Sequence, residues 1–294
     1  MRRLVAAVAT LVLVLLLAGM DGVPAAPAAT PAVPAVAVAV AHLDWVQTTV
    51  SIVVDGLTRG YLLVRPARTP TAALPVLVEL HGCCTTPAFE LERSGFLDVT
   101  GPAILVYPTG YRQRWNAGAC CGSTGVDDVK FVTDVVEQVL ARQPAADRHR
   151  VYLVGYSNGG RMAYRMACAK PQLFAAVATF AAVNAQACPG PAPVSLLLAA
   201  GTADPELATS GSATRHSAGG YLEPTVDEQV AQYRQADGCA ADPSTTAAGN
   251  LISLRWTGCA SGAVVQLSWY VGGKHAWPRN LARVMWTFLQ PLHR

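Results

Sequence analysis

The stretch VYLVGYSNGGRMAY, residues 151–164, changes from a strand pattern to a helix pattern at a serine between glycines. Its first four residues favour a buried strand, and residues 161–169 have helical spacing. Gly-x-Ser-x-Gly at such a junction is typical of a nucleophilic serine, because the strained turn lifts the hydroxyl above the sheet. Side chains at Gly155 or Gly159 would collide with the neighbouring strand and helix. We therefore predict that Ser157 is a nucleophile.

A serine nucleophile needs a base, and three histidines follow Ser157 in the chain. His293 is the penultimate residue, and His216 lies in a Ser/Thr/Gly-rich loop with no strand before it. His275 directly follows the strand predicted at 264–271, and loops at the carboxyl ends of strands collect the sites of open α/β sheets. We predict that His275 is the general base; a structural histidine is the alternative.

The base needs a carboxylate that orients its ring and stabilises the imidazolium. Between Ser157 and His275, only Asp204 follows a buried strand within a few residues, the apolar run at 193–200. We therefore predict that Asp204 orients the base. The other acids fall in loops or on a helix, where a solvated charge is expected: Glu206, Glu223, Asp227, Glu228, Asp237 and Asp242. The order Ser, Asp, His along the chain is that of α/β-hydrolases.

The negative charge that develops on a substrate oxygen needs backbone N–H donors. The amide of Asn158, one residue after the nucleophile, is the first candidate. The second should come from the loop after an early strand, where His81-Gly82-Cys83 stands. Cys83 is the predicted donor, with Cys84 as the alternative. We expect His81 to brace this loop rather than to take part in the chemistry.

Aromatic residues flank the predicted site in the sequence. Trp115 and Trp277 are candidates for an aromatic wall against a ring or a sugar, and core packing is the alternative. Tyr156, beside the nucleophile, is expected to pack and to shape the acyl pocket. Asp127 and Asp128 are expected to cap the helix predicted at 126–142.

Short apolar runs alternate with helical segments from about residue 45 onward. Asp55-Gly56 between two β-rich runs predicts a hairpin. The other predicted strands are 75–80, 103–107, 150–154, 174–183, 193–200 and 264–271, and the predicted helices are 126–142, 161–169, 226–237 and 281–289. This alternation favours an α/β fold with a mostly parallel central sheet and helices on both faces. We expect one catalytic domain at 45–294.

The first residues have the order of a secretory signal peptide, which we predict at 1–26 without defining the cleavage site. Arg2 and Arg3 precede an apolar run at 4–18, and small residues follow. The run is shorter than the ~20 residues of a membrane span, although an uncleaved anchor is the alternative. Met20 stands where a lipoprotein would need cysteine. Residues 27–44 are Ala/Pro-rich and are expected to form a disordered leader.

Composition excludes one class of partner. The 294 residues are 52% hydrophobic and 14% charged, with a formal net charge of +3 and no block of basic residues. Binding to nucleic acid therefore has no electrostatic support. We expect a secreted monomer with no stable membrane anchor.

Eight cysteines fit an exported protein, since disulfides persist outside the reducing cytosol. The expected partners are Cys168 with Cys188, Cys239 with Cys259, and Cys83 and Cys84 with Cys120 and Cys121 in an undecided pairing. The first two bridges each close a loop of roughly 20 residues, worth ~3 kcal/mol. Metal binding is not expected, because the chain has no C-x-x-C step and no histidine at ligand spacing.

Over about residues 47–290 the chain resembles secreted esterases of the polyhydroxybutyrate depolymerase and feruloyl/acetyl-xylan esterase type, within the α/β-hydrolase superfamily. The resemblance implies a triad of Ser157, Asp204 and His275 and an oxyanion hole at Cys83 and Asn158. The motifs that carry it are Leu80-His81-Gly82-Cys83, Trp115-Asn116-Ala117-Gly118 with Cys120-Cys121-Gly122, Val126-Asp127-Asp128-Val129, Gly155-Tyr156-Ser157-Asn158-Gly159-Gly160, Gly201-Thr202-Ala203-Asp204-Pro205 and Gly273-Lys274-His275-Ala276-Trp277-Pro278.

The chain departs from this group at Lys274 and Arg279, where the group usually has glycines. These two cations beside the predicted base either favour anionic substrates or are simply solvated. The segment 206–215 lacks the group's pattern, so the resemblance says little about contacts to substrate there.

These features predict a secreted carboxylic-ester hydrolase that works by two-step acyl transfer without a metal or organic cofactor. The expected substrates are feruloyl or acetyl esters of plant cell-wall polysaccharide such as xylan, or small soluble esters. A hydroxyalkanoate oligomer or polymer is the alternative substrate. A secreted relative that binds a ligand without catalysis is the rival from another class.

Overall fold

The computed structural model of the chain describes residues 44–68, 70–118, 120–121, 125–210, 215, 217–218 and 220–294. These residues belong to one unit. The predicted signal peptide, the leader up to residue 43 and His216 lie outside the described residues, so those predictions stay open.

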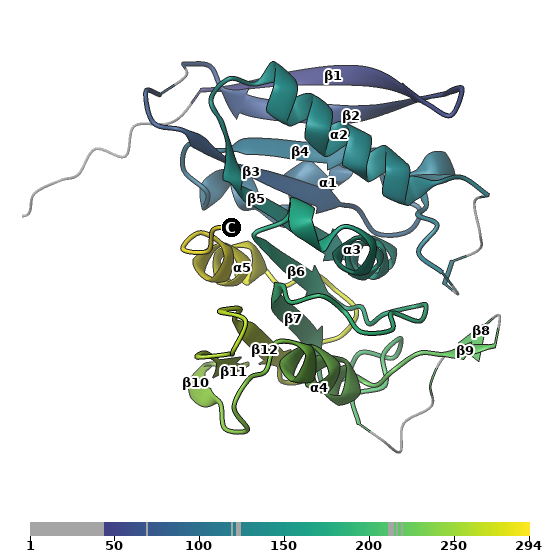
Figure 1. Cartoon of the computed structure of the whole chain (residues 1–294), viewed down its shortest axis with the longest axis vertical. Helices are drawn as coiled ribbons and strands as arrows, with labels where there is room; N and C mark the ends of the chain where they lie inside the picture. Colours follow the sequence, from purple (N-terminus) through teal and green to yellow (C-terminus); the bar gives the residue numbers. More distant parts are fainter. Residues whose placement is uncertain are drawn as a thin grey trace, which may run out of the picture. The chain divides into compact units, whose positions relative to one another are not determined.

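Parallel strands form the centre of the structure (Figure 1). The main sheet of the described residues has the order β1-β2-β4-β3-β5-β6-β7-β12-β11-β10. The six strands from β4 to β12 in this order run parallel, while β1 and β2 at one edge and β11 and β10 at the other pair antiparallel. The prediction of a mostly parallel sheet is therefore confirmed.

The strands are β1 (Trp45–Val54), β2 (Leu57–Pro66), β3 (Leu74–Leu80), β4 (Ile104–Pro108), β5 (Ala146–Tyr156), β6 (Ala176–Phe180), β7 (Ser195–Gly201), β10 (Ser244–Ala248), β11 (Leu251–Trp256) and β12 (Val265–Tyr270), and a separate small pair, β8 (Ser217–Ala218) and β9 (Tyr221–Leu222). The helices are α1 (Pro87–Ser94), α2 (Asp128–Arg142), α3 (Asn158–Ala169), α4 (Val226–Ala236) and α5 (Leu281–Leu289), with 3-10 turns at Phe96–Asp98, Tyr111–Gln113 and Pro171–Leu173.

Helices cover both faces of the sheet because each central strand is apolar on both sides. Side chains of α2, α3 and α4 pack into one core cluster with alternate strand residues such as Val76, Val78 and Leu80. Side chains of α1 and α5 pack into the second cluster, where Leu77 points. Figure 1 shows α2, α3 and α4 in front of the strands and α1 behind them. Successive side chains of a strand point to opposite faces of the sheet, so each buried strand contributes residues to both core clusters.

Local patterns predicted most elements. Asp55 (φ 51°) and Gly56 (φ 77°) form the hairpin turn between β1 and β2, where left-handed backbone favours such a pair. The helix α5 matches its predicted residues.

The sequence interpretation missed α1 and the hairpin of β10 and β11. Every residue of β10 is exposed, so this strand has no apolar signal, although Gly249-Asn250 between two extended runs marks the turn. The helix α1 has only eight residues; Thr86 caps it by accepting from the amide of Phe89, and Pro87 begins it. The Gly-Asn turn and the Thr-Pro helix start are each only two residues long. Without an apolar run beside them, they do not predict an element.

Candidate active site

The predicted nucleophile stands at the turn between β5 and α3. Ser157 has φ 53° and ψ −118°, a strained conformation for a residue with a side chain. Its amide donates to the carbonyl of Phe180 (3.0 Å), and its carbonyl accepts from the amide of Arg161 (3.0 Å). Strand β6 and helix α3 thus hold the turn from both sides and keep the hydroxyl at the carboxyl end of β5.

The two glycines of the motif are required by close backbone contacts. A Cβ on Gly159 would lie 2.0 Å from the carbonyl oxygen of Leu80, and a Cβ on Gly155 would lie 2.3 Å from the carbonyl oxygen of Gly159. Helix α3 therefore begins directly against β3 and β5, as the sequence pattern predicts.

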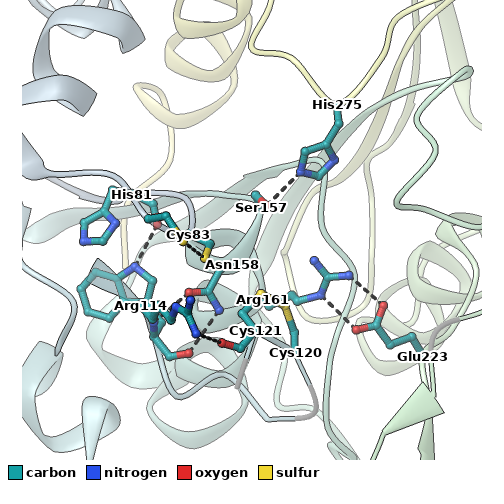
Figure 2. Close-up of a disulfide and its surroundings, with 12 residues drawn as sticks. His81, Cys83, Arg114, Cys120, Cys121, Ser157, Asn158, Arg161, Glu223 and His275 are labelled. Atoms are coloured by element: carbon teal, nitrogen blue, oxygen red, sulfur yellow. Dashed lines mark hydrogen bonds and ion pairs between the residues drawn. A yellow bond between two sulfur atoms is a disulfide. The ribbon is translucent and has the colours of Figure 1, made fainter. Parts of the chain in front are cut away.

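The structure brings together the three residues predicted to form the site. The Nε2 of His275 lies 2.9 Å from the Oγ of Ser157, and its Nδ1 lies 3.0 and 2.8 Å from Oδ1 and Oδ2 of Asp204. Figure 2 shows the imidazole directed at the serine hydroxyl. Because Asp204 only accepts, Nδ1 carries the proton and Nε2 is left to accept from the hydroxyl. The Asp204 side chain is fully buried, whereas 22% of the His275 side chain is exposed.

Neighbouring strands explain why Asp204 and His275 meet. Strands β7 and β12 pair in parallel, with Gly201 opposite Tyr270, so both following loops leave at the same edge. The amide of Ala203 donates to the carbonyl of Gly273 (2.9 Å), and the amide of Glu206 donates to Oδ1 of Asp204 (2.8 Å). A Cβ on Gly201 would lie 2.2 Å from the Gly273 oxygen, so glycine permits this approach.

The backbone around Cys83 and Asn158 has the features needed for an oxyanion hole. Asn158 is the first residue of α3, so its N–H has no partner within the helix. No backbone acceptor for the amide of Cys83 occurs among the described residues, whereas the amide of Cys84 donates to the carbonyl of Gln113 (2.8 Å). Cys84 is therefore engaged elsewhere, which favours Cys83 over it.

A buried clamp that the sequence interpretation missed supports this backbone. The Asn158 side chain accepts from the amide of Trp115 (2.7 Å) and donates to the carbonyl of the same residue (3.1 Å). The indole of Trp115 donates to the carbonyl of His81 (2.9 Å). His81 in turn accepts at Nε2 from the amide of Gly110 (3.0 Å) and bonds the carbonyl of Gly82 through Nδ1 (2.8 Å). These bonds tie both predicted donor segments to one another (Figure 2).

Trp115 and His81 both have structural roles. Trp115 is fully buried and stacks on Phe131, so it braces the core and does not form a wall against substrate; that prediction is wrong. Burial lowers the pKa of His81, which agrees with a neutral ring used for bracing. The position of a tryptophan next to a motif does not indicate whether its ring points into the core or toward the substrate.

The other two aromatic residues contact each other, and one of them contacts His275. Tyr156 is half-buried, with its ring centroid 5.6 Å from that of His275, and its hydroxyl donates to the carbonyl of His275 (2.8 Å). The ring of Trp277, also half-buried, meets Tyr156 edge-on at 5.9 Å. Lys274 and Arg279 are exposed, with no ion pair to a described residue. Tyr156 thus contacts His275 directly, and Trp277, in the same loop as His275, packs against Tyr156.

Asp127 and Asp128 have different roles. Asp127 caps α2 by accepting from the amide of Lys130 (2.9 Å), as expected. Asp128 is fully buried; it pairs with Arg59 (2.5 Å) and accepts from the amide of Asn116 (2.6 Å). The expectation of a second cap is wrong. The carboxylate instead holds the backbone next to Trp115 in place.

Glu223, which the sequence analysis treated as a solvated charge, is buried. Its carboxylate accepts from Nε and Nη2 of Arg161 at 3.0 and 2.9 Å. Figure 2 shows this pair beside the start of α3. The two-point contact joins the first turn of the nucleophile's helix to the segment before α4, a distant connection that no local pattern indicates.

The structure contains disulfides Cys168–Cys188 and Cys239–Cys259, the pairings expected from spacing. The adjacent pairs differ from expectation. Cys120 is bonded to Cys121, and Cys83 and Cys84 form no disulfide, with their Sγ atoms 2.6 Å apart. Sequence spacing cannot distinguish a bond within an adjacent pair from one between two pairs, because that choice depends on how the two loops fold.

Two features are absent from the described residues. These residues contain no group of three or more His, Cys, Asp or Glu side chains placed to hold a metal ion. Among their helices, none combines the length and the apolar character that a membrane crossing requires.

Known proteins share parts of this sequence. A model of the prolyl oligopeptidase family matches residues 109–187, which include Ser157. "Putative esterase NocK" of Nocardia uniformis subsp. tsuyamanensis is 32% identical over 264 residues, covering 80% of this chain and 75% of that protein. Feruloyl esterase C of Emericella nidulans is 32% identical over 136 residues, covering 46% of each chain, so the match spans about half of that relative.

Solved structures share the fold. The acetyl xylan esterase from Aspergillus awamori superposes with a TM-score of 0.58 at 17% identity, covering 78% of this chain and 93% of that one. The Bacillus cereus carboxylesterase gives 0.53 at 16% identity, covering 79% and 94%. With this fold and a relative 32% identical over three quarters of its length, the chain belongs to the α/β-hydrolase esterases, as a serine carboxylic-ester hydrolase.

Proposed function

We propose that this protein is a secreted esterase that releases feruloyl or acetyl groups from plant cell-wall polysaccharide through Ser157, His275 and Asp204. The observation that carries the proposal is the continuous contact from the Ser157 hydroxyl through the His275 ring to the buried Asp204 carboxylate. The names of the relatives supply the substrate class: one is a feruloyl esterase, and a structure with the same fold is an acetyl xylan esterase. The three disulfides of the described residues support the proposal that the protein works in an oxidising compartment outside the cytosol.

The proposed reaction is acyl transfer in two steps. His275 Nε2 takes the proton of Ser157 as its oxygen attacks the ester carbonyl carbon. The amides of Cys83 and Asn158 stabilise the oxygen that becomes negative, and Asp204 stabilises the imidazolium. The imidazolium gives its proton to the leaving alcohol. A water molecule, deprotonated by the same ring, then attacks the acyl-enzyme and releases the acid.

Labelling with a fluorophosphonate probe tests whether Ser157 is the nucleophile. It also distinguishes an esterase from a related protein that binds a ligand without catalysis. We expect one adduct on the peptide that contains Ser157, and complete loss of both labelling and ester hydrolysis in Ser157→Ala. Ser261→Ala, which changes an exposed serine, should behave as wild type. Labelling of Ser157→Ala at the wild-type rate would contradict the assignment.

A substrate panel tests the ester class. Methyl ferulate, acetylated xylan and hydroxybutyrate oligomers should be compared by kcat/KM on the same preparation. We expect the feruloyl or the acetyl ester to exceed the hydroxybutyrate oligomers by at least about tenfold, a difference of ~1.4 kcal/mol in the transition state. The reverse order would replace the proposed substrate with a hydroxyalkanoate.

A further inference from the structure

Arg93, on the helix that the sequence analysis missed, lies between two aromatic rings near the active site. Its guanidinium carbon is 4.3 Å from the ring centroid of Tyr156 and 4.7 Å from that of Trp277. The same guanidinium pairs with the fully buried carboxylate of Glu90 one turn earlier. Only 19% of the Arg93 side chain is exposed. Because Glu90 already balances its charge, the residue is poorly suited to binding a substrate anion.

Both rings hold the segment that carries His275. The hydroxyl of Tyr156 donates to the carbonyl of His275 (2.8 Å), and the indole of Trp277, two residues later, donates to the carbonyl of Ser94 (3.2 Å). Helix α1 thus reaches the loop of the base in two ways: through the guanidinium of Arg93 and through the last carbonyl of the helix. No other element of the described residues makes both kinds of contact with this loop.

The planar shape of the Arg93 guanidinium allows it to contact the two rings and Glu90 at the same time. It can lie against an aromatic face while its N–H groups bond a carboxylate, whereas a lysine ammonium is a point charge that cannot do both in the same way. Removal of the guanidinium takes away the one group that lies over both the Tyr156 and the Trp277 ring in the described part of the chain. A catalytic group displaced by about 1 Å can lose roughly 100-fold in rate.

We propose that Arg93 is a positioning residue for His275: paired with Glu90, it supports Tyr156 and Trp277 and thereby fixes the imidazole at hydrogen-bond distance from Ser157. The proposal rests on the proposed function, in which His275 is the base. Arg93 itself touches no reacting atom.

The experiment measures kcat and KM for 4-nitrophenyl acetate, with active sites counted by fluorophosphonate titration. Arg93→Met should lower kcat about 10- to 100-fold with KM within about twofold of wild type. Arg93→Lys should recover only part of kcat. Arg283→Met, which removes an exposed arginine on α5, serves as the matched control and should leave both constants unchanged.

A double-mutant cycle separates positioning from a general loss of stability. Tyr156→Phe removes the bond to the carbonyl of His275, so its effect on kcat should overlap with that of Arg93→Met, and the double variant should lose less than the product of the two. A kcat for Arg93→Met within twofold of wild type would overturn the proposal. If Arg93→Met does not fold, Arg93→Lys decides: full wild-type kcat overturns it, and a reduced kcat at unchanged KM supports it. Failure of the proposed function is recognised separately, by a wild type no more active than Ser157→Ala.

Discussion

At the scale of single residues, the environment of Asp204 determines what its carboxylate can do. Its side chain is fully buried, both oxygens face the Nδ1 of His275, and Oδ1 also accepts from the amide of Glu206. A buried carboxylate with these partners is held in one orientation, so it selects the tautomer in which Nε2 is free to accept from Ser157. Exposed acids such as Asp242 have no such constraint.

Replacing this carboxylate by an amide should therefore impair catalysis far more than folding. Asp204→Asn keeps the size and one acceptor oxygen, but its NH₂ group would face Nδ1 and favour the wrong tautomer. We expect kcat to fall by about 10³- to 10⁴-fold, the range known for such triads. Steady-state kinetics on a small acetate ester measures the effect, and circular dichroism monitors the fold. Asp242→Asn is the matched control; a loss of less than tenfold in Asp204→Asn would show that this carboxylate does not orient the base.

At the scale of elements, β3 and α1 bury two carboxyl groups against each other. Glu79 of β3 and Glu90 of α1 are 1% and 0% exposed. Burial, followed by the neighbouring charge of Glu90, raises the pKa of Glu79 well above its ordinary value. The groups that face Glu79 are Glu90, Arg93 and Ser94 from α1 and the hydroxyl of Tyr107 from β4. Arg93 pairs with Glu90, so we expect Glu79 to be the carboxyl group that keeps its proton in the folded state.

This pair predicts a pH-dependent stability. Above about pH 4.3 the unfolded chain loses the Glu79 proton while the folded chain keeps it, so the unfolded state binds fewer protons and stability falls as pH rises toward the folded pKa. Glu79→Gln removes this cost. We expect Glu79→Gln to have the wild-type Tm near pH 4 and a Tm higher by at least about 2–4 °C near pH 8, the effect of ~1 kcal/mol in a domain of this size.

Thermal scans at both pH values provide the measurement. Glu92→Gln, which changes an exposed glutamate on α1, should show no difference from wild type that grows with pH. A Tm for Glu79→Gln that is lower than wild type at pH 8 would mean that the ionised carboxylate stabilises the fold, contrary to this interpretation.

At the scale of the whole molecule, two disulfides join segments that belong to different elements. Cys168 at the end of α3 joins Cys188 after β6, and Cys239 after α4 joins Cys259 after β11. Each bridge spans a sequence separation of 20 residues. The remaining four cysteines lie in the two loops near the predicted oxyanion hole, where Arg114 donates to the carbonyl of Cys121 (3.3 Å). Their pairing decides whether those loops are joined covalently.

A peptide map under non-reducing conditions tests that pairing. Trypsin cleaves after Arg68, Arg93, Arg114 and Lys130, so Cys83 and Cys84 fall on one peptide and Cys120 and Cys121 on another. With free thiols alkylated before digestion, we expect two alkyl groups on the first peptide and an intact bond within the second. Mass spectrometry of a joined pair of peptides would instead support the cross-bridge expected from the sequence. The peptides of Cys239 and Cys259, which cleavage after Arg255 separates, stay joined by their disulfide and serve as the internal positive control.

The sequence alone determined the central parallel strands, the turn at Ser157 and the three residues of the candidate triad, because each has a local signature. Buried parallel strands are continuous apolar runs, the Gly155 and Gly159 contacts exclude any side chain, and sites gather where strands end. Only the tertiary structure decided what Trp115, Asp128, Glu223 and Arg93 contact, and which cysteines pair. Those contacts join segments far apart in the chain, and whether a polar or aromatic side chain points into the core or out of it depends on the partner that the fold brings to it.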